Sequence, residues 1–264
     1  KESDYIQSEL YANSLKVVKR NSNILFYDCT NYFFEIEEAE GLKQYGPSKE
    51  HKPNPIVQMG LFMDGNGIPL AFSISKGNTN EQQTLKPLEE KILEDFKLSK
   101  FVVCTDAGLA SNDNRKFNDK DDRAFITTQS IKKLKNHLKD WALSPEDWRL
   151  CGDNKTYNLN ELDDIEDLDK VFYKERWIKE NGLEQKLLVT YSIKYRNYHR
   201  KIRNSQIERA LKVIKNPAKL KKSNQNDYKR LIKSTNFTHD GEIAKKVSYN
   251  IDTNLILKEE AFDG

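Results

Sequence analysis

The sequence predicts a mixed α/β fold in which three antiparallel strands are followed by alternating helices and strands. Three observations support this prediction. Two apolar runs at 57–75 flank a tight turn, a short apolar strand at 101–106 follows a helical pattern at 79–96, and the pattern changes after residue 130. Hairpin-linked and helix-linked strands in one segment indicate a mixed sheet with helices packed against it.

The first 55 residues are expected to hold a helix, a strand and an ordered loop. Residues 1–22 are predicted to be helical because apolar side chains recur there at nearly helical spacing. These side chains are Ile6, Leu10, Leu15 and Val18. The apolar run at 23–29 predicts a strand that closes on Asp28, and the following residues either continue it or begin a loop. The segment 41–55 contains three prolines and two glycines and is typical of a loop.

The segment 57–96 carries the clearest local signals. The turn at 64–67, Asp-Gly-Asn-Gly, joins two apolar runs and predicts a β-hairpin. A helix is expected next, capped by Thr79 or Asn80, with Pro87 ending one turn or kinking it. Its apolar face consists of Leu85, Leu88, Ile92 and Phe96.

Two further strands complete the first half of the chain. The continuous apolar run at 101–106 is typical of a strand that is buried on both faces. A short helix or loop is expected at 112–118, and another strand at 123–129. This order of antiparallel strands and crossovers is that of a ribonuclease H-like fold, with a mixed sheet flanked by helices.

The second half of the chain has a different pattern and predicts a β-rich insertion. Short strand candidates at 171–178 and 186–192 follow an acidic run, and a basic helix is expected at 194–215. A polar linker at 216–227 and a small β unit in the last 30 residues would complete it. Trp141, Trp148 and Trp177 are expected in the core of the insertion, with base stacking as the alternative.

These patterns divide the chain into three parts. Residues 1–22 are predicted to be an N-terminal helical segment, residues 23–130 the first part of a ribonuclease H-like core, and residues 131–264 the insertion with its basic helix.

The charge of the chain is unevenly distributed. The net charge is +3, but residues 194–233 hold 14 Lys and Arg against Glu208 and Asp227, a local net charge of +12. Such a block indicates a polyanionic partner, or it is a solvated basic helix. The three widely spaced cysteines argue against a disulfide framework or zinc site and favour a reducing cytosol. No apolar run has the ~20 residues that a membrane span requires.

Two predicted strands each deliver a carboxylate at the end of an apolar run. Asp28 and Asp106 would emerge at the same edge if these strands are neighbours. Two close carboxylates are costly unless a cation neutralises them, and a hard divalent ion such as Mg²⁺ takes oxygen ligands. An aspartate that ends a strand is also a common turn former or helix cap, so the pair by itself leaves both interpretations open.

Three long motifs resemble the DDE transposases of bacterial insertion sequences, the group whose ribonuclease H-like core is interrupted by a β-strand insertion. The motifs are YDCTNYFFE at 27–35, GPSKEHKPNPIVQMGLFMDGNGIPLAFSISKGNTNEQQTLKPL at 46–88, and FVVCTDAGLASNDNRKF at 101–117. The similarity continues through 189–210 and covers essentially the whole chain.

The resemblance implies catalytic and metal-binding roles for two residues. The first two catalytic aspartates of the family fall on Asp28 and Asp106, which would bind Mg²⁺ or Mn²⁺ and support DNA strand cleavage and transfer at insertion-element ends. It also implies double-stranded DNA as partner, a homodimer on DNA, no membrane association, and a nucleoid-associated location in a bacterial cytoplasm.

The third family carboxylate is a glutamate in the motif Tyr-x2-Arg-x3-Glu-x6-Lys, which this sequence lacks. Tyr198 and Arg200 are too close together, and the residue four before Glu208 is Asn204. We therefore expect a chain that is truncated before its catalytic glutamate and does not transpose DNA alone. Glu208 is either a substitute for the third carboxylate or an ion-pair partner of basic residues within its own helix.

Basic residues in two regions are candidates for DNA phosphate contacts. Lys49, His51 and Lys52 lie in the proline-rich loop, and Arg115 follows Asp106. The basic block adds Arg200, Lys201, Arg203, Arg209 and Lys212. The alternative for the loop residues is a plain solvated loop.

Three functions are consistent with the sequence. The first is a truncated DDE transposase domain. The second is a catalytically inactive DNA-binding or oligomerising remnant of such an enzyme, and the third is another ribonuclease H-like nuclease.

Overall fold

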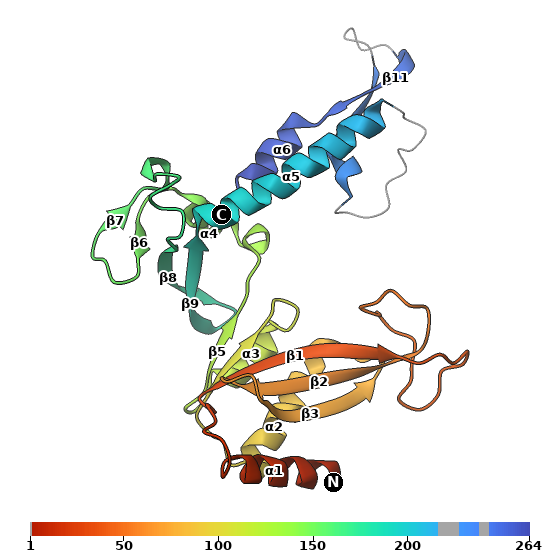
Figure 1. Ribbon diagram of the computed structural model, residues 1–264, viewed down its shortest axis with the longest axis vertical. Coiled ribbons are helices and arrows are strands. Elements are labelled where there is room, and N and C mark those ends of the chain that lie inside the picture. The colour runs from red at the N-terminus through yellow and green to blue at the C-terminus, as the bar shows by residue number, and fades with distance from the viewer. Residues whose placement is uncertain (1, 216–226, 238–242) are drawn as a thin grey trace. The chain divides into compact units, whose positions relative to one another are not determined.

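The chain folds into two compact units, Lys1–Lys133 and Leu134–Gly264. The computed structural model describes residues 2–215, 227–237 and 243–264 (Figure 1). The division between the units lies close to residue 130, where the sequence pattern changes. The assignment of the units as catalytic core and insertion stays a prediction, and all but the last residue of the predicted linker lies outside the described residues.

The first unit is built on a five-stranded mixed sheet (Figure 1). Its strands are β1 (Ile24–Phe33), β2 (Ile56–Asp64), β3 (Pro69–Lys76), β4 (Val102–Thr105) and β5 (Ala124–Thr127). The spatial order is β3-β2-β1-β4-β5, with β1, β2 and β3 antiparallel and β4 and β5 parallel to β1. This order confirms the predicted fold class.

The β2–β3 hairpin turn is organised by a buried ion pair. Arg20 donates from Nε to Asp64 Oδ2 at 2.7 Å and from Nη2 to the carbonyl oxygens of Ile68 and Pro69. Burial alone would disfavour the charged carboxylate, but the hydrogen bonds from Arg20 and from the backbone N–H groups of Ile68 and Asn66 hold the pKa of Asp64 below its ordinary value. The turn is therefore anchored to the segment that precedes β1.

Helix α1 (Glu2–Ser14) packs with a different face from the one predicted. Ile6 and Leu10 are exposed, whereas Gln7 and Tyr11 are buried. The Gln7 side-chain oxygen accepts a hydrogen bond from the Phe72 backbone N–H at 2.7 Å, on the edge strand β3. Hydrophobic spacing does not reveal a hydrogen bond to the edge of a strand, and the predicted apolar face was wrong. The predicted extension of the helix to residue 22 was also wrong, since α1 ends at Ser14.

Helix α2 (Leu85–Asp95) packs apolar side chains into the core beneath the sheet. Asn80 caps a short 3₁₀ turn, Glu81–Gln83, that precedes it. Pro87 neither ends nor kinks the helix, because it lies in the first turn, where a missing N–H has no helical partner to lose. Buried core side chains from the helix and the strands include Leu85, Leu88, Ile92, Leu25, Tyr27, Phe62 and Val103.

The segment for which the sequence allowed a helix or a loop is helical and forms α3 (Asn112–Asn118). A buried polar cluster joins it to α2. Glu89 on α2 accepts hydrogen bonds from Asn118 Nδ2 at 3.0 Å and from Arg123 Nη1 at 3.1 Å. Burial raises the pKa of Glu89 despite these two donors. The cluster fixes the chain between β4 and β5.

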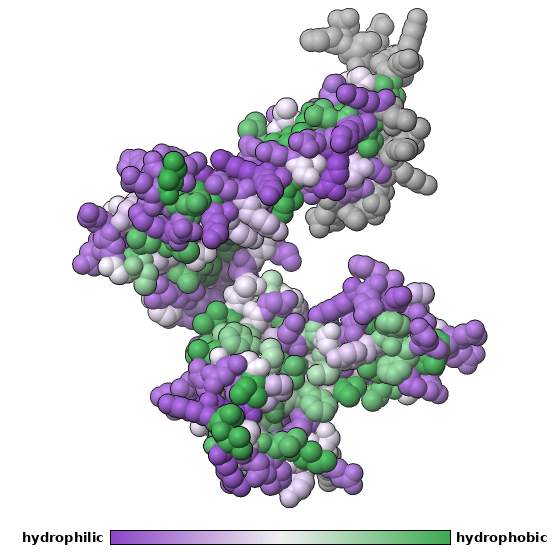
Figure 2. Space-filling model, viewed as in Figure 1, coloured by the Kyte–Doolittle hydropathy of each residue, from purple (hydrophilic) through white to green (hydrophobic). Residues whose placement is uncertain are grey.

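The two faces of the sheet differ in their cover. Alternation along β1 buries Leu25, Tyr27 and Cys29 under the helices. The opposite face keeps large apolar side chains exposed, and apolar surface is visible on the first unit in Figure 2. These exposed residues are Ile24, Phe26, Phe72, Ile74 and Ile126. Residues with even numbers in β1, among them Asp28, therefore point away from the helices.

The second unit contains a four-stranded sheet in the order β7-β6-β8-β9. It follows α4 (Asn136–Leu143) and comprises β6 (Trp148–Leu150), β7 (Thr156–Tyr157), β8 (Phe172–Glu180) and β9 (Leu183–Tyr191). Trp148 is buried, and the centroid of its ring lies 4.6 Å from Nζ of the buried Lys174. Trp177 is 64% exposed, so its predicted place in the core was wrong.

A long helix and a hairpin complete the second unit (Figure 1). The elements are α5 (Ile193–Ile214), β10 (Ile232–Phe237), β11 (Ile243–Ile251) and α6 (Thr253–Glu260). Ala210 on α5 packs against Leu231 and Ile232. The predicted basic helix and β unit are thus present, but the sequence analysis missed α6. Among the described residues no helix is long and apolar enough to cross a membrane.

The buried ion pair at the hairpin turn generates a stability prediction. Substitution Arg20→Leu should destabilise the first unit by about 3–5 kcal/mol, because it leaves the buried Asp64 carboxylate without its cationic partner. All three tryptophans lie in the second unit, so the loss should be measured as faster amide hydrogen exchange in β2 and β3.

The matched control is Lys43→Leu, which breaks the exposed ion pair with Glu40. This change should cost less than about 1 kcal/mol. Equal effects of the two substitutions would contradict the structural role assigned to Arg20.

Candidate active site

Asp28 lies in the middle of β1 and presents its carboxylate on the exposed face of the sheet. The expectation that the strand closes on Asp28 was wrong, since β1 continues to Phe33. The side chain of Asp28 is 72% exposed, and its Oδ1 accepts a hydrogen bond from the Cys29 backbone N–H at 2.7 Å. Cys29 itself is buried on the other face of the sheet, away from the Asp28 carboxylate, and burial raises the pKa of its thiol.

Asp106 follows β4 directly and begins a tight turn. Its Oδ1 accepts hydrogen bonds from the backbone N–H groups of Gly108 at 2.9 Å and Leu109 at 3.2 Å. The Thr127 hydroxyl on β5 donates to the Asp106 carbonyl oxygen at 3.1 Å. The turn-former role considered for Asp106 is therefore real, and it holds the exposed carboxylate at the carboxyl end of β4.

The parallel pairing of β1 and β4 relates the two aspartates. Ile24 pairs with Val102, Leu25 with Val103 and Phe26 with Cys104. Strand β4 ends at Thr105, and continuing the same register by two residues would bring Asp106 level with Asp28. Cross-strand neighbours in register point to the same face. Asp28, within β1, and Asp106, directly after β4, thus belong to neighbouring parallel strands.

The proline-rich loop brings a cation to Asp28. Lys49 Nζ lies 4.0 Å from Asp28 Oδ1 and donates a hydrogen bond to the carbonyl oxygen of Cys29. Asn31 on β1 binds this part of the loop, since its side chain accepts from the Lys49 backbone N–H and donates to the carbonyl oxygen of Pro47. The site therefore contains two carboxylates and one ammonium group.

The other predicted residues of this region have individual surroundings. His51 is exposed with a positive φ of 57°, and Lys52 Nζ lies 5.3 Å from the centroid of the Phe33 ring. Arg115 on α3 donates from Nη2 to Gln129 Oε1 at 2.9 Å. Asn31 was missed by the sequence analysis. A polar residue at an inward position of a strand was the signal that would have found it.

The donor chemistry of Asp28 and Asp106 fits a divalent metal ion. Both groups are exposed carboxylates on neighbouring parallel strands, and hard cations such as Mg²⁺ prefer oxygen ligands. The described residues contain no cluster of three or more His, Cys, Asp or Glu side chains that could hold a metal by itself. The pair can therefore supply part of a coordination sphere that water and phosphate oxygens would complete.

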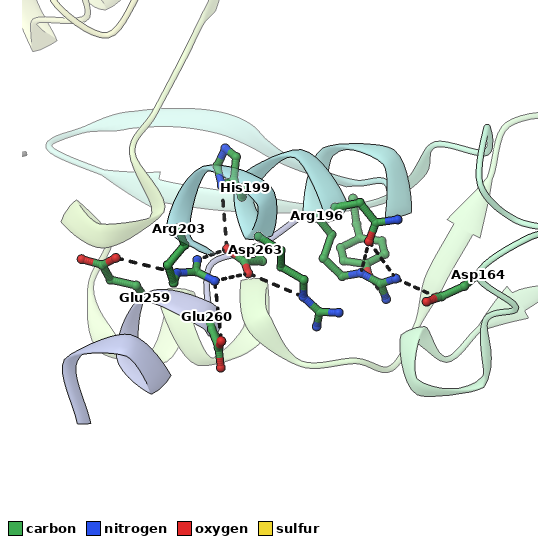
Figure 3. Close-up of polar contacts among 10 residues, drawn as sticks. Asp164, Arg196, His199, Arg203, Glu259, Glu260 and Asp263 are labelled. Carbon is green, nitrogen blue, oxygen red and sulfur yellow. Dashed lines mark hydrogen bonds and ion pairs between the residues drawn. The ribbon is translucent and has the colours of Figure 1, made fainter. Parts of the chain in front are cut away.

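Helix α5 combines basic residues that are buried in ion pairs with others that are exposed (Figure 3). Arg203 is 6% exposed and donates from both terminal nitrogens to the Asp263 carboxylate. It also lies 3.8 Å from carboxylate oxygens of Glu259 and Glu260. Arg203 joins α5 to the end of α6, and its position does not support the predicted DNA contact.

Other basic residues of α5 are open to solvent. Lys201, Arg209 and Lys212 are exposed, and Arg200 lies 3.9 Å from Asp263 with half of its side chain exposed. Lys201, Arg209 and Lys212 fall within ~80° of one another at ~100° per helical residue. Glu208 is exposed on the same helix and is the one acidic residue in it.

Comparison with known proteins gives a family match. The family described as "Transposase DDE domain" matches residues 33–224, well over half of the chain, including Asp106 but not Asp28. No curated protein matches the chain.

Solved structures of transposases are distant matches. The Mos1 transposase paired-end complex with the left transposon end is 14% identical, with a TM-score of 0.27, over 48% of this chain and 40% of that one. The piggyBac transposase synaptic complex with hairpin DNA is 10% identical, with a TM-score of 0.35, over 64% of this chain and 33% of that one. The Mos1 mariner paired-end complex with Mn is 12% identical, with a TM-score of 0.27, over 47% and 41%. The chain thus spans about two fifths or less of the length of each of these proteins.

The ion pairs of Arg203 generate a prediction about α6. Substitution Arg203→Met removes the two hydrogen bonds to the buried Asp263 carboxylate and leaves Arg200 at 3.9 Å as a more distant cation, at a cost of up to about 3–5 kcal/mol. Amide hydrogen exchange should accelerate throughout α6. Lys201→Met, two residues earlier on the same helix, is exposed and should leave the exchange unchanged. An unaltered α6 in the Arg203 variant would show that its docking does not depend on this cluster.

Proposed function

The chain belongs to the transposase DDE domain family, and from this we propose that it serves metal-dependent cleavage and transfer of DNA strands at the ends of a mobile element. The observation that carries the proposal is the pair of exposed carboxylates on adjacent parallel strands, Asp28 within β1 and Asp106 directly after β4. A divalent cation would neutralise such a pair, and metal ions activate the nucleophile and stabilise the leaving oxygen in phosphodiester chemistry.

Asp28 and Asp106 would hold Mg²⁺ or Mn²⁺. The ion would lower the pKa of a bound water or 3′-hydroxyl and neutralise charge on the phosphate oxygens. The backbone of this chain restrains both carboxylates. The N–H of Cys29 donates to Asp28, and the N–H groups of Gly108 and Leu109 donate to Asp106. Carboxylates that are fixed before binding reduce the ordering that metal and substrate must impose.

Double-stranded DNA is the proposed partner, bound through phosphate contacts. The exposed side of α5 with Lys201, Arg209 and Lys212 is the strongest candidate in the second unit, and Arg200 extends it. In the first unit Lys49, His51, Lys52 and Arg115 are the candidates. Contacts of this kind provide affinity and position but do not read sequence. Assembly of two chains on DNA, as a homodimer, is part of the same proposal.

Metal binding tests the assignment of the carboxylates. Mn²⁺ titration followed by electron paramagnetic resonance should show a site that Asp28→Asn or Asp106→Asn each weakens by at least about tenfold, since each removes a charged ligand. Asp113→Asn, an exposed carboxylate on α3, should leave the site unchanged. If Mn²⁺ binds equally well to all variants, the proposed metal site is wrong.

The salt dependence of DNA binding tests the α5 surface. Replacing Lys201, Arg209 and Lys212 by Gln should reduce the slope of log K against log salt by up to about 2.7, because each lost phosphate contact contributes about 0.9.

The control for this measurement removes the same charge elsewhere. The triple Gln variant of Lys100, Lys116 and Lys120, three exposed lysines of the first unit, should keep the wild-type slope. Equal slopes for both triple variants would exclude α5 as the phosphate-binding surface. DNA binding that persists while the metal site fails its test would instead support a DNA-binding remnant without catalytic activity.

A further inference from the structure

The loop between β1 and β2 is fastened to the sheet at its base. Gln44 and Ile56 exchange two backbone hydrogen bonds, of 2.9 and 2.8 Å, and the Phe34 N–H donates to the Pro55 carbonyl oxygen at 2.9 Å. Gly46 packs so closely on the sheet that an added Cβ would lie 2.0 Å from the Gly77 carbonyl oxygen. These contacts leave the loop little freedom where it leaves and rejoins the sheet.

A buried asparagine then sets the position of one loop residue. Asn31 is 8% exposed, and it binds the loop at two points, the carbonyl oxygen of Pro47 at 3.3 Å and the N–H of Lys49 at 3.2 Å. Because Asn31 and Asp28 belong to the same strand, this anchor places the Lys49 backbone relative to the Asp28 carboxylate.

The side chain of Lys49 returns to β1. Its ammonium group donates to the Cys29 carbonyl oxygen and lies 4.0 Å from Asp28 Oδ1. About half of the Lys49 side chain remains exposed, so it can leave this position without unfolding the loop. Lys43, in the same loop, pairs with Glu40, and Lys52 lies over Phe33. In the described part of the loop, Lys49 is therefore the lysine that is paired with an active-site carboxylate.

We propose that Lys49 is a built-in counter-cation of Asp28 that competes with a divalent ion for this carboxylate. The inference rests on the proposed function, because it takes Asp28 as a metal ligand. A divalent ion bound to Asp28 lies within a few Å of the ammonium group and is repelled by it. The lysine therefore lowers the intrinsic metal affinity of the free protein and must be displaced for tight binding.

This arrangement would couple metal binding to the substrate. A DNA phosphate is an alternative partner for the ammonium group, and a lysine that moves to phosphate relieves the repulsion at Asp28. Any ligand that draws Lys49 away from Asp28 then increases metal affinity, and linkage requires that the metal favours that ligand in return. Lys49 is thus a positioning residue, since it acts through Asp28.

Mn²⁺ titration of the free protein, without DNA, tests the proposal. Lys49→Met removes the charge and keeps the length of the side chain, so the Mn²⁺ dissociation constant should fall by about 3- to 15-fold at low ionic strength, for a repulsion over about 5 Å that is partly screened. Lys49→Arg retains the charge and should stay near the wild-type value. Lys43→Met, in the same loop but paired with Glu40 and not beside Asp28, should also leave the constant unchanged.

Two results would overturn the proposal. An unchanged constant in Lys49→Met would show that the ammonium group does not compete, and weaker binding would show that Lys49 supports the metal. Asp28→Asn separates this failure from failure of the proposed function. Where Asp28→Asn weakens Mn²⁺ binding but Lys49→Met does not strengthen it, the metal site stands and the role of Lys49 is wrong.

Discussion

The parallel register between β1 and β4 is the constraint on which the candidate site depends. Three consecutive pairs, from Ile24–Val102 to Phe26–Cys104, set the two strands side by side. Continued by two residues, the same register would bring Asp106 level with Asp28. A shift by one residue would turn one carboxylate into the core beneath the helices, because side chains alternate along a strand. The apolar residues that bury the inner face, Leu25 and Val103 among them, therefore also determine which residues reach the outer face.

The inner face contributes to the site in a second way. Asn31 is buried on the side of the strand opposite to Asp28, yet it holds the loop that carries Lys49. Buried polar groups need hydrogen-bond partners, and here the partners are backbone groups of a loop that would otherwise be free to move. The same strand thus supplies a carboxylate on one face and the anchor of its counter-cation on the other. Metal, lysine and DNA phosphate would be linked through this short segment.

In the second unit, basic residues have two separate purposes. Arg203 and Arg196 are drawn into ion pairs with Asp263 and Asp164, which join α5 to α6 and to the segment before β8. Lys201, Arg209 and Lys212 remain in solvent and can meet phosphates. The net charge of +12 around this helix therefore overstates the charge available to a polyanion. The sequence analysis considered a polyanion-binding block and a solvated basic helix. Neither interpretation includes the structural ion pairs of Arg203 and Arg196.

Local patterns in the sequence were enough to predict the β2–β3 hairpin, α2, the basic helix and the fold class, because turn chemistry and apolar spacing act between near neighbours. They also located Asp28 and Asp106 at strands, and family motifs assigned them a role. Tertiary structure decided what depends on residues far apart in the chain. The β1–β4 register, the Asn31 anchor of Lys49, the packing of α1 through Gln7 and the burial of Arg203 by Asp263 are of this kind. Each results from packing and hydrogen-bond satisfaction between distant segments, which the spacing of residues along one segment does not encode.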